Sequence, residues 1–406
     1  MKKFSIILAL SLLLGGIANA GNPVKWPLDE LYRTPGVTPM PSYDIGGIKA
    51  ILIDGIDYKG EPTKFFAYYG LTEGASPDNS APAMVLVHGG LGTAFWEWVK
   101  VWNELGYAAI SMDTTGRLPI RLTNGLEYPA KGGWALLPGG LYLDWGGFER
   151  GLRDAEEQWP YCAVAEVIQS HSFLRSLPEV DATRIGLTGN SWGGFLTLLT
   201  AAVDKRYQFA APVYACGFFE EMTAWNIHDA AGRRWCDLFD PMHYIPQIEV
   251  PILWAAGTND FAFDFPTHQK SMALASVPSY KAIRLRMIHT DGKDKEGQPQ
   301  ETFALADHLL KGGPDLPVAG DAVIGKKGTA AFDYELNGRT IESIEFFYTT
   351  SDVTPWRDRE WLVMNVPLPR KGNNASVKLP EGTTAFFFNV NTTDGLTCSS
   401  TACMIK

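Results

Sequence analysis

The stretch Ile185-Gly-Leu-Thr-Gly-Asn-Ser-Trp-Gly-Gly-Phe-Leu-Thr-Leu-Leu199 is the most informative part of the chain. Residues 185–188 are typical of a short buried strand, and the residues from Trp192 onward are typical of a helix. The turn between them is a G-x-S-x-G motif, and in this strand–turn–helix setting a serine hydroxyl stands exposed above a sheet. Its two glycines are needed because side chains there would crowd the turn. The motif predicts that Ser191 is a nucleophile in acyl transfer. The alternative is a glycine-rich turn that only opens a buried helix.

Strands and helices alternate on both sides of this motif. An early antiparallel strand pair is expected at 48–56 and 63–69. Further strands are expected at 83–87, 107–112, 185–188, 209–214, 252–256 and 281–288, and helices at 95–105, 163–177, 192–203, 266–275 and 301–310. Repeated strand–helix–strand order predicts an α/β fold with a mainly parallel sheet covered by helices on both faces.

The pattern changes after residue 312. Short strands without helical periodicity are expected at 330–336, 341–348, 361–366, 375–379 and 384–390, separated by turn signals such as Asn337-Gly338. This pattern predicts a small β-sandwich at 329–406 after a linker at 313–328. The α/β domain is then expected to span 48–312, preceded by an N-terminal extension at 21–47.

Two long insertions interrupt the α/β pattern at 114–160 and 217–248. Both follow the carboxyl end of a strand, where ligands bind in open α/β sheets. Long loops in a compact domain are commonly functional. The insertions are therefore expected to form the walls of a substrate pocket, with Trp134, Trp145 and Trp225 as tentative lining residues.

The first twenty residues are predicted to be a signal peptide. Lys2 and Lys3 precede a short apolar run, and Ala18-Asn-Ala20 is a small-residue cleavage site. The apolar run is too short to span a bilayer, and no later segment is a membrane candidate. The protein is therefore expected to be exported, to the periplasm or to the medium.

Charge and cysteine content narrow the function classes further. The formal net charge of −10, without a basic cluster, argues against nucleic acid as a partner. Among the five cysteines, Cys398 and Cys403 are close enough in sequence for a local disulfide in an oxidising compartment. A bridge between Cys216 and Cys236 is an alternative that spacing cannot decide. No spacing resembles a metal site, so no metal and no cofactor are expected.

A histidine and an acid should follow the serine along the chain. Three histidines lie beyond the region of the acid. His268 and His308 fall within expected helices, whereas His289 follows an apolar strand, where a base could reach the serine, and it is favoured. Asp260, after the strand at 252–256, is the favoured acid that would orient the imidazole. Asp264 is the alternative, and either aspartate could instead be a helix cap.

An oxyanion hole requires two backbone N–H groups near the nucleophile. One is expected from Trp192, which follows the serine. The other is expected from Gly90 or Leu91, in the loop after the strand at 83–87. His88, at the start of this loop, is expected to shape it and not to act as the base.

In their order and setting, these segments resemble the α/β-hydrolase superfamily over about residues 48–312. The segments His88-Gly-Gly-Leu-Gly-Thr-Ala-Phe95, Gly106-Tyr-Ala-Ala109, Gly189-Asn-Ser-Trp-Gly-Gly194 and Gly257-Thr-Asn-Asp260 resemble the prolyl-oligopeptidase-like and acetylxylan-esterase-like branch. Leu91 departs from the HGGG loop of lipases and esterases, although a backbone donor tolerates that change. The resemblance implies an exported, cofactor-independent serine carboxylesterase that removes short, acetyl-like acyl groups from carbohydrate esters.

Two alternatives stay open at this point. An aminopeptidase or amidase would need an acidic anchor for a substrate N-terminus, such as Glu156-Glu157 or Glu220-Glu221. The S9-type peptidases usually carry a propeller before the hydrolase domain, and too few residues precede 48 for one. A glycan-binding protein on a hydrolase scaffold would use the loop tryptophans and would not need all three members of a triad. The oligomeric state is not indicated.

Overall fold

The structure is a computed structural model that describes residues 23–119, 121–122, 125–126, 135–290, 292, 295, 297–326 and 328–405. The predicted signal peptide and Trp134 lie outside these residues. Among the described residues, none of the helices combines the length and the apolar character that a bilayer crossing requires.

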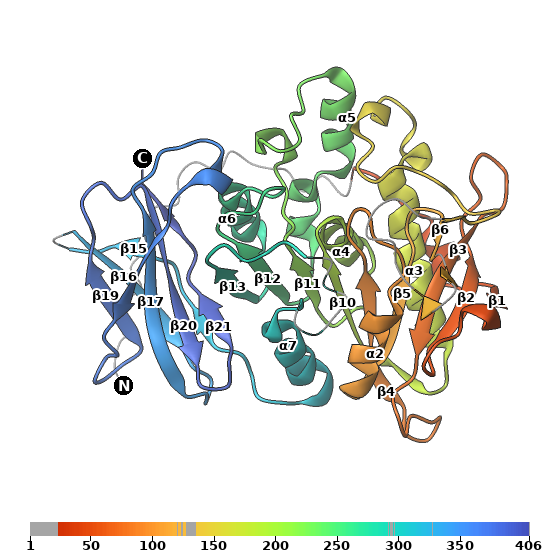
Figure 1. Ribbon diagram of the computed structural model, residues 1–406, viewed down its shortest axis with the longest axis horizontal. Helices are drawn as coiled ribbons and strands as arrows, with labels where there is room; N and C mark the ends of the chain where they lie inside the picture. The colour runs from red at the N-terminus through yellow and green to blue at the C-terminus, as the bar shows by residue number, and fades with distance from the viewer. Residues whose placement is uncertain are drawn as a thin grey trace, which may run out of the picture.

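A nine-stranded sheet forms the centre of the molecule (Figure 1). Its spatial order is β1 (Val37–Pro39), β2 (Lys49–Asp54), β3 (Lys64–Gly70), β5 (Ala108–Met112), β4 (Ala81–Val87), β10 (Val180–Asn190), β11 (Ala210–Val213), β12 (Ile252–Gly257) and β13 (Ser279–Arg284). The first four strands in this order pair antiparallel, and the six from β5 to β13 pair in parallel. The predicted early hairpin and mainly parallel sheet are confirmed.

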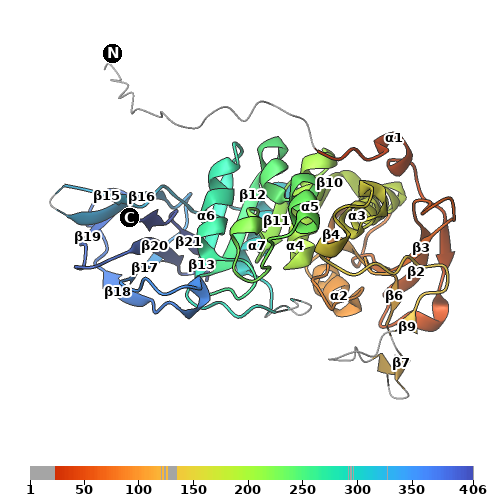
Figure 2. The same cartoon turned by 90° about the horizontal axis from the view of Figure 1, so that it is seen from above.

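Helices cover both faces of the sheet because its parallel strands are apolar on both sides. β4 illustrates the rule: Val85 and Val87 pack into one core and Met84 and Leu86 into the other. The first core includes α3 (Trp159–Ser176), α4 (Trp192–Val203) and α6 (Phe265–Leu274). The second includes α2 (Trp96–Glu104) and α7 (Gln300–Lys311). In Figure 2, α3 and α6 are seen in the upper part of the view and α2 in the lower part. The architecture is that of an α/β-hydrolase.

Shorter elements complete this part of the chain. They are the helix α1 (Leu28–Leu31), the helix α5 (Ala230–Phe239) in the second insertion, the short strands β6 (Arg117–Leu118), β7 (Arg121–Leu122), β8 (Gly125–Leu126) and β9 (Ala135–Leu136), and the 3₁₀ helices Pro41–Tyr43, Phe148–Arg150, Ala155–Glu157, Phe219–Glu221, Pro241–His243 and Ile245–Gln247.

The strand predicted at 281–288 is wrong in its bounds. β13 begins at Ser279 and ends at Arg284. The apolar residues that follow resembled a buried strand, but Leu285 is 37% exposed and Ile288 is 77% exposed. His289 therefore lies in a loop five residues beyond the strand and not directly after it.

The strands after α7 form a small β-domain of two facing antiparallel sheets. One contains β14 (Val318–Ala319), β15 (Val323–Ile324), β16 (Thr329–Glu335) and β19 (Asn374–Lys378). The other contains β17 (Ile341–Thr349), β18 (Leu362–Val366), β20 (Ala385–Thr392), β21 (Thr397–Ser399) and β22 (Cys403–Met404). Phe332 from the first sheet stacks on Phe388 from the second at 4.4 Å between ring centroids, so a sandwich core lies between them. β14 and β15 lie within the segment predicted as a linker.

This C-terminal β-domain packs against β13, the last strand of the central sheet (Figure 1). The Ile283 N–H donates to Ser399 Oγ at 2.7 Å, and Asn389 Nδ2 donates to the Ile283 carbonyl at 2.9 Å. Phe265, at the start of α6, packs against Trp361 and Phe387 of the β-domain. Side chains of the β-domain thus pair with the backbone of Ile283 at the edge of the hydrolase sheet.

All five cysteines are free thiols, so neither considered disulfide is present. Cys398 lies opposite Val390 and Cys403 opposite Phe386, four positions apart along β20. At about 3.3 Å per residue this register separates the two cysteines by roughly 13 Å, beyond the reach of a disulfide. Burial raises the pKa of the Cys398 thiol to about 12.

Candidate active site

Ser191 stands at the turn between β10 and α4, in strained backbone. Its φ of 58° and ψ of −121° cost a residue with a side chain about 1–3 kcal/mol. The Ser191 N–H donates to the Val213 carbonyl of β11 at 2.8 Å, which holds the turn against the sheet. A Cβ on Gly189 would lie 2.3 Å from the Gly193 carbonyl oxygen, so the close approach requires glycine. Ser191 is partly exposed, whereas every residue of α4 is buried.

Asp260 and His289 form a direct hydrogen-bonded pair. His289 Nδ1 lies 2.7 Å from Asp260 Oδ2. The other carboxylate oxygen accepts the N–H groups of Ala262 and Phe263 at 2.8 and 2.9 Å. Burial raises the pKa of Asp260, but the hydrogen bond and charge of His289 and these N–H groups outweigh it, and the pKa lies below its usual value. The carboxylate therefore stays ionised and holds the Nδ1 proton, which leaves Nε2 as the basic nitrogen.

The loop that carries His289 packs beside the serine turn. Tyr214 directly follows β11, the strand whose Val213 carbonyl accepts the Ser191 N–H. Its ring stacks on His289 with centroids 4.6 Å apart. Its hydroxyl donates to the Ile288 carbonyl at 2.7 Å. A Cβ on Gly292 would lie only 1.6 Å from Nδ2 of Asn190, the residue before the serine. Among the described residues no hydrogen bond joins the Ser191 hydroxyl to His289, as is common before substrate binds.

The other candidate histidines and the other candidate acid make different contacts. His268 is fully buried in α6, where burial lowers its pKa to about 4 and neither ring nitrogen has a partner among the described residues. His308 Nδ1 lies 2.9 Å from the Gly313 carbonyl at the end of α7. Asp264 accepts the Thr223 N–H at 3.0 Å. His308 Nε2 also lies 3.4 Å from Asp315 Oδ1, so this ring has an aspartate other than Asp260 as its neighbour.

The loop after β4 lies directly against Ser191. A Cβ on Gly89 would be 3.1 Å from the Ser191 Cβ, and one on Gly90 would be 2.8 Å from the Trp192 ring. Leu91 has a φ of 64° and is 67% exposed. The Trp192 N–H is at the first position of α4, where helices offer no internal acceptor. The expected oxyanion donors therefore border the serine from two sides.

His88 shapes this loop, as expected. It is buried, its Nε2 accepts the Thr114 N–H at 3.0 Å, and its Nδ1 lies 2.7 Å from the Gly89 carbonyl. Because Nε2 accepts an N–H, the ring proton is on Nδ1 and donates to that carbonyl, and desolvation lowers the pKa of His88.

The two insertions meet over Trp192. Trp145 from the first and Trp225 from the second lie 5.7 and 5.0 Å from its ring centroid, and both are partly exposed. Behind them Phe148 packs on Trp235 at 4.5 Å, which joins the insertions to each other. Two of the three tentative pocket tryptophans thus converge next to Ser191, while Trp134 lies outside the described residues.

Sequence reasoning missed two features of the site. Tyr214 was expected only as the end of a strand, and its stacking on His289 had no local signal. Phe261 follows the acid in sequence, is 56% exposed, and lies 4.8 Å from the His289 ring. An aromatic residue directly after the acid was the signal that could have identified it.

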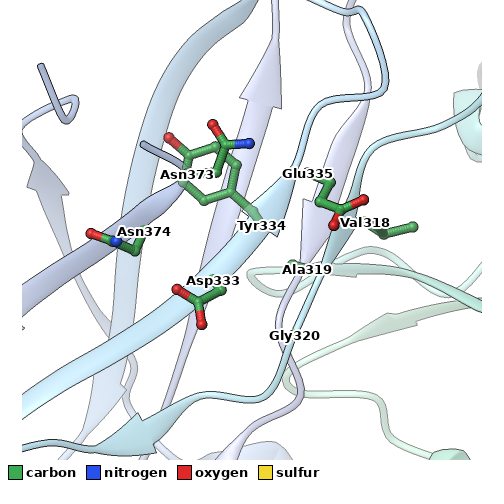
Figure 3. A pocket seen from close by; sticks show the side chains of 8 residues that line it. All are labelled: Val318, Ala319, Gly320, Asp333, Tyr334, Glu335, Asn373 and Asn374. Atoms are coloured by element: carbon green, nitrogen blue, oxygen red, sulfur yellow. The ribbon is translucent and has the colours of Figure 1, made fainter. Parts of the chain in front are cut away.

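A separate hollow of about 540 Å³ lies in the C-terminal β-domain (Figure 3). Its polar side chains are those of Asp333, Glu335, Tyr334, Asn373 and Asn374. It holds no serine, cysteine or histidine, so it has no counterpart of the serine and histidine found at the Ser191 turn. Within the described ranges, no group of three or more histidines, cysteines and acids is arranged to hold a metal ion.

Comparison with known proteins identifies a family match in part of the chain and a similar fold in solved structures. Residues 68–231 match the model of the acetyl xylan esterase (AXE1) family, a stretch that includes the loop after β4 and the serine turn but ends before Asp260 and His289. The acetyl xylan esterase from Paenibacillus sp. R4 superimposes with a TM-score of 0.50 at 22% identity, covering 70% of this chain and 91% of that one.

Acetyl xylan esterase 1 from Thermoanaerobacterium sp. JW/SL YS485 gives a TM-score of 0.51 at 16% identity, covering 71% of this chain and 94% of that one. At such identities these likenesses show the fold alone. The chain is therefore an α/β-hydrolase that resembles the acetyl xylan esterase branch, and its residues 68–231 carry the match to that family.

Proposed function

We propose that this protein is a serine carboxylesterase that removes short, acetyl-like acyl groups from carbohydrate esters. The observation that carries the proposal is the 2.7 Å hydrogen bond between His289 and Asp260, on a loop packed beside the strained Ser191 turn. The match to the acetyl xylan esterase family supports an ester substrate.

The reaction follows from the roles of these groups. The Ser191 hydroxyl attacks the ester carbonyl while its proton passes to His289 Nε2. The N–H groups of Trp192 and of Gly90 or Leu91 stabilise the charge on the tetrahedral oxygen. His289 then gives the proton to the departing alcohol, and the bond between the acyl carbon and the alcohol oxygen breaks. Water, deprotonated by the same nitrogen, then attacks the acyl-serine; the bond between the acyl carbon and Ser191 Oγ breaks, the proton passes from His289 to Oγ, and the acid is released.

Crowding near the serine supports a small acyl group. A Cβ on Gly90 would lie 2.8 Å from the Trp192 ring and 3.2 Å from the Trp145 ring, so the loop and the two indoles are already in contact. Trp192 is 2% exposed and cannot swing away without disturbing the aromatic cluster around it. This side of the serine favours acetyl over long acyl chains.

Two partly exposed indoles support a sugar on the other side of the ester bond. Trp145 and Trp225 present flat apolar surfaces beside Trp192, which suit the faces of pyranose rings. We also propose that residues 1–20 direct export, because polymeric glycans are outside the cell.

The anchors of a peptidase are not favoured. Glu157 pairs with Lys59 at 2.8 Å, and Glu221 pairs with Lys270. Glu156 and Glu220 are exposed on the surface. These contacts are typical of solvated surface charges.

The test compares the chain without residues 1–20 with its Ser191→Ala variant. The substrates are p-nitrophenyl acetate, p-nitrophenyl butyrate and an amino-acid p-nitroanilide, followed by acetylated xylan. We expect the acetate to be cleaved faster than the butyrate, and turnover to fall by about 10³-fold or more in the variant. A variant with near-normal activity would overturn the assignment of the nucleophile. Anilide cleavage without ester cleavage would favour a peptidase, and a protein that binds xylan but hydrolyses none of these would be a glycan-binding protein.

A further inference from the structure

Asn259, the residue before Asp260, connects the candidate active site to the C-terminal β-domain. Its Nδ2 donates two hydrogen bonds, each of 2.8 Å, to the carbonyl oxygens of Arg357 and Arg359. Both carbonyls belong to the β-domain, at and just after the 3₁₀ helix Trp356–Asp358. One amide group thus joins the turn that carries the acid to a separate layer of the molecule.

The same side chain also reaches the loop of the base. Asn259 Oδ1 accepts the Thr258 hydroxyl at 2.7 Å, and Thr258 Oγ1 in turn accepts the Arg286 N–H at 3.0 Å. Arg286 lies three residues before His289, and the Thr258 N–H donates to the Arg284 carbonyl at 3.0 Å. The chain of hydrogen bonds therefore runs from the β-domain through the acid turn to the base loop.

The orientation of this amide is fully determined. Two carbonyl oxygens require the NH₂ end of Asn259, and a hydroxyl that donates requires the oxygen end, so a flipped amide would lose these bonds. Thr258 is fully buried, so its hydroxyl has no water to replace a lost partner. A network with every member satisfied is rigid in the way that a catalytic pair requires.

We propose that Asn259 is a positioning residue through which the C-terminal β-domain holds the Asp260 turn and the His289 loop in register. Asn259 touches no reacting atom, and its effect passes through Thr258 and the backbone on either side. The β-domain is on this view part of the catalytic apparatus and not an appended module. The inference rests on the proposed roles of Asp260 and His289.

The test measures kcat and KM for p-nitrophenyl acetate in the full chain and in Asn259→Ala. Loss of the amide frees the acid turn, and displacements approaching 1 Å cost up to about 10²-fold in turnover. We expect kcat to fall by about 10- to 100-fold while KM changes by less than about two-fold, because the substrate contacts are retained.

The matched control is Gln269→Ala. Gln269 Oε1 accepts the Ala402 N–H at 2.7 Å, so this variant removes another amide-to-backbone bond across the same domain interface, away from the Asp260 turn. We expect its kcat to stay within about two-fold of the parent even where its melting temperature falls as much as that of Asn259→Ala. Equal kcat losses in the two variants would reduce Asn259 to an ordinary interface residue and overturn the proposal.

A second pair covers the case in which Asn259→Ala does not fold. Thr258→Ser retains the hydroxyl and Thr258→Val replaces it at constant shape. Thr258→Ser should retain kcat within about three-fold of the parent. Thr258→Val should lose about as much kcat as is expected of Asn259→Ala. Indistinguishable kcat values for the two would also overturn the proposal. The nucleophile is tested separately, since activity in Ser191→Ala would refute the proposed function whatever happens at Asn259.

Discussion

Gly193→Ala is expected to separate the geometry of the serine turn from the stability of the fold. A Cβ at this position would lie 2.0 Å from the Val87 carbonyl oxygen and 2.6 Å from that of His88. Both obstacles are backbone atoms, so no side chain can rotate away. To reach an ordinary contact of 3.4 Å, either α4 or the loop after β4 must shift by about 1.4 Å. α4 begins at Trp192, directly after Ser191, and so carries one expected oxyanion donor, whereas the loop carries the other, from Gly90 or Leu91.

The size of the effect follows from that shift. Overpacking of this kind costs about 1–3 kcal/mol of folding free energy. Misplacement by about 1 Å at a catalytic centre costs roughly 10²-fold in turnover, which is about 2.7 kcal/mol of barrier. We expect a protein that is still folded and whose kcat for p-nitrophenyl acetate is lower by at least about 10²-fold.

The assay needs a matched glycine substitution, and β10, the strand that leads into the serine turn, offers one. A Cβ on Gly186 of β10 would lie 2.3 Å from the Phe209 ring and 2.8 Å from the Met84 sulfur, which are side-chain atoms remote from the turn. Gly186→Ala should therefore lose similar stability but retain kcat within a few-fold. Melting temperature and titration with a serine-directed phosphonate report the folded and reactive fractions. Wild-type turnover in Gly193→Ala, or an equal loss in Gly186→Ala, would refute the reasoning.

Four other outcomes are expected. Asp260→Asn should lower kcat by about 10⁴-fold, because an amide no longer holds the Nδ1 proton of His289; a loss below ten-fold in a steady-state assay would contradict this. Burial raises the pKa of Asp260, but its contacts with His289 bring the pKa below the unfolded value of about 3.9, so its contribution to stability is present above pH 4 and is lost as pH falls through the lower folded value. The free energy of unfolding, measured with urea, should thus fall more steeply between pH 6 and pH 3 in the parent than in Asp260→Asn. Tyr214→Phe removes the donor to the Ile288 carbonyl but retains the ring on His289, so we expect about 0.5–1.5 kcal/mol of lost stability by urea unfolding and kcat within a few-fold. A thiol reagent should count five free thiols in the unfolded protein, and a count of three would contradict the structure.

Most of the central sheet could be predicted because its strands are buried on both faces. All seven residues of β4 are buried, and a continuous apolar run of that length has few other uses in a soluble fold. The same rule failed for the residues up to Ile288, which are apolar but exposed near the site. A run of apolar residues indicates burial, and it gives a wrong prediction where the apolar side chains are exposed to solvent. The strands β14 and β15 have two residues each, too few to show a period.

The residues of the site also differ in how far the sequence could predict them. Ser191 and the glycines around it could be predicted because a tight turn constrains its own sequence. The partner of Asp260 could be proposed from chain order, but the partners of Asn259 could not, since Arg357 and Arg359 lie 98 and 100 residues further on. Their contribution is two backbone carbonyl oxygens, which every residue carries. Long-range contacts with main-chain atoms leave no mark on the sequence.

The covered edge of β13 has a consequence for the order in which the molecule can be completed. The Ile283 N–H and carbonyl find their partners at Ser399 and Asn389, 116 and 106 residues later. At about 5–20 residues per second, a nascent chain spends about 6–23 s with that edge open after Ile283 has emerged. An open apolar edge is a template for pairing with another chain. Truncation before residue 389 should therefore yield a protein that aggregates during synthesis, because Asn389 and Ser399 supply the partners of this edge.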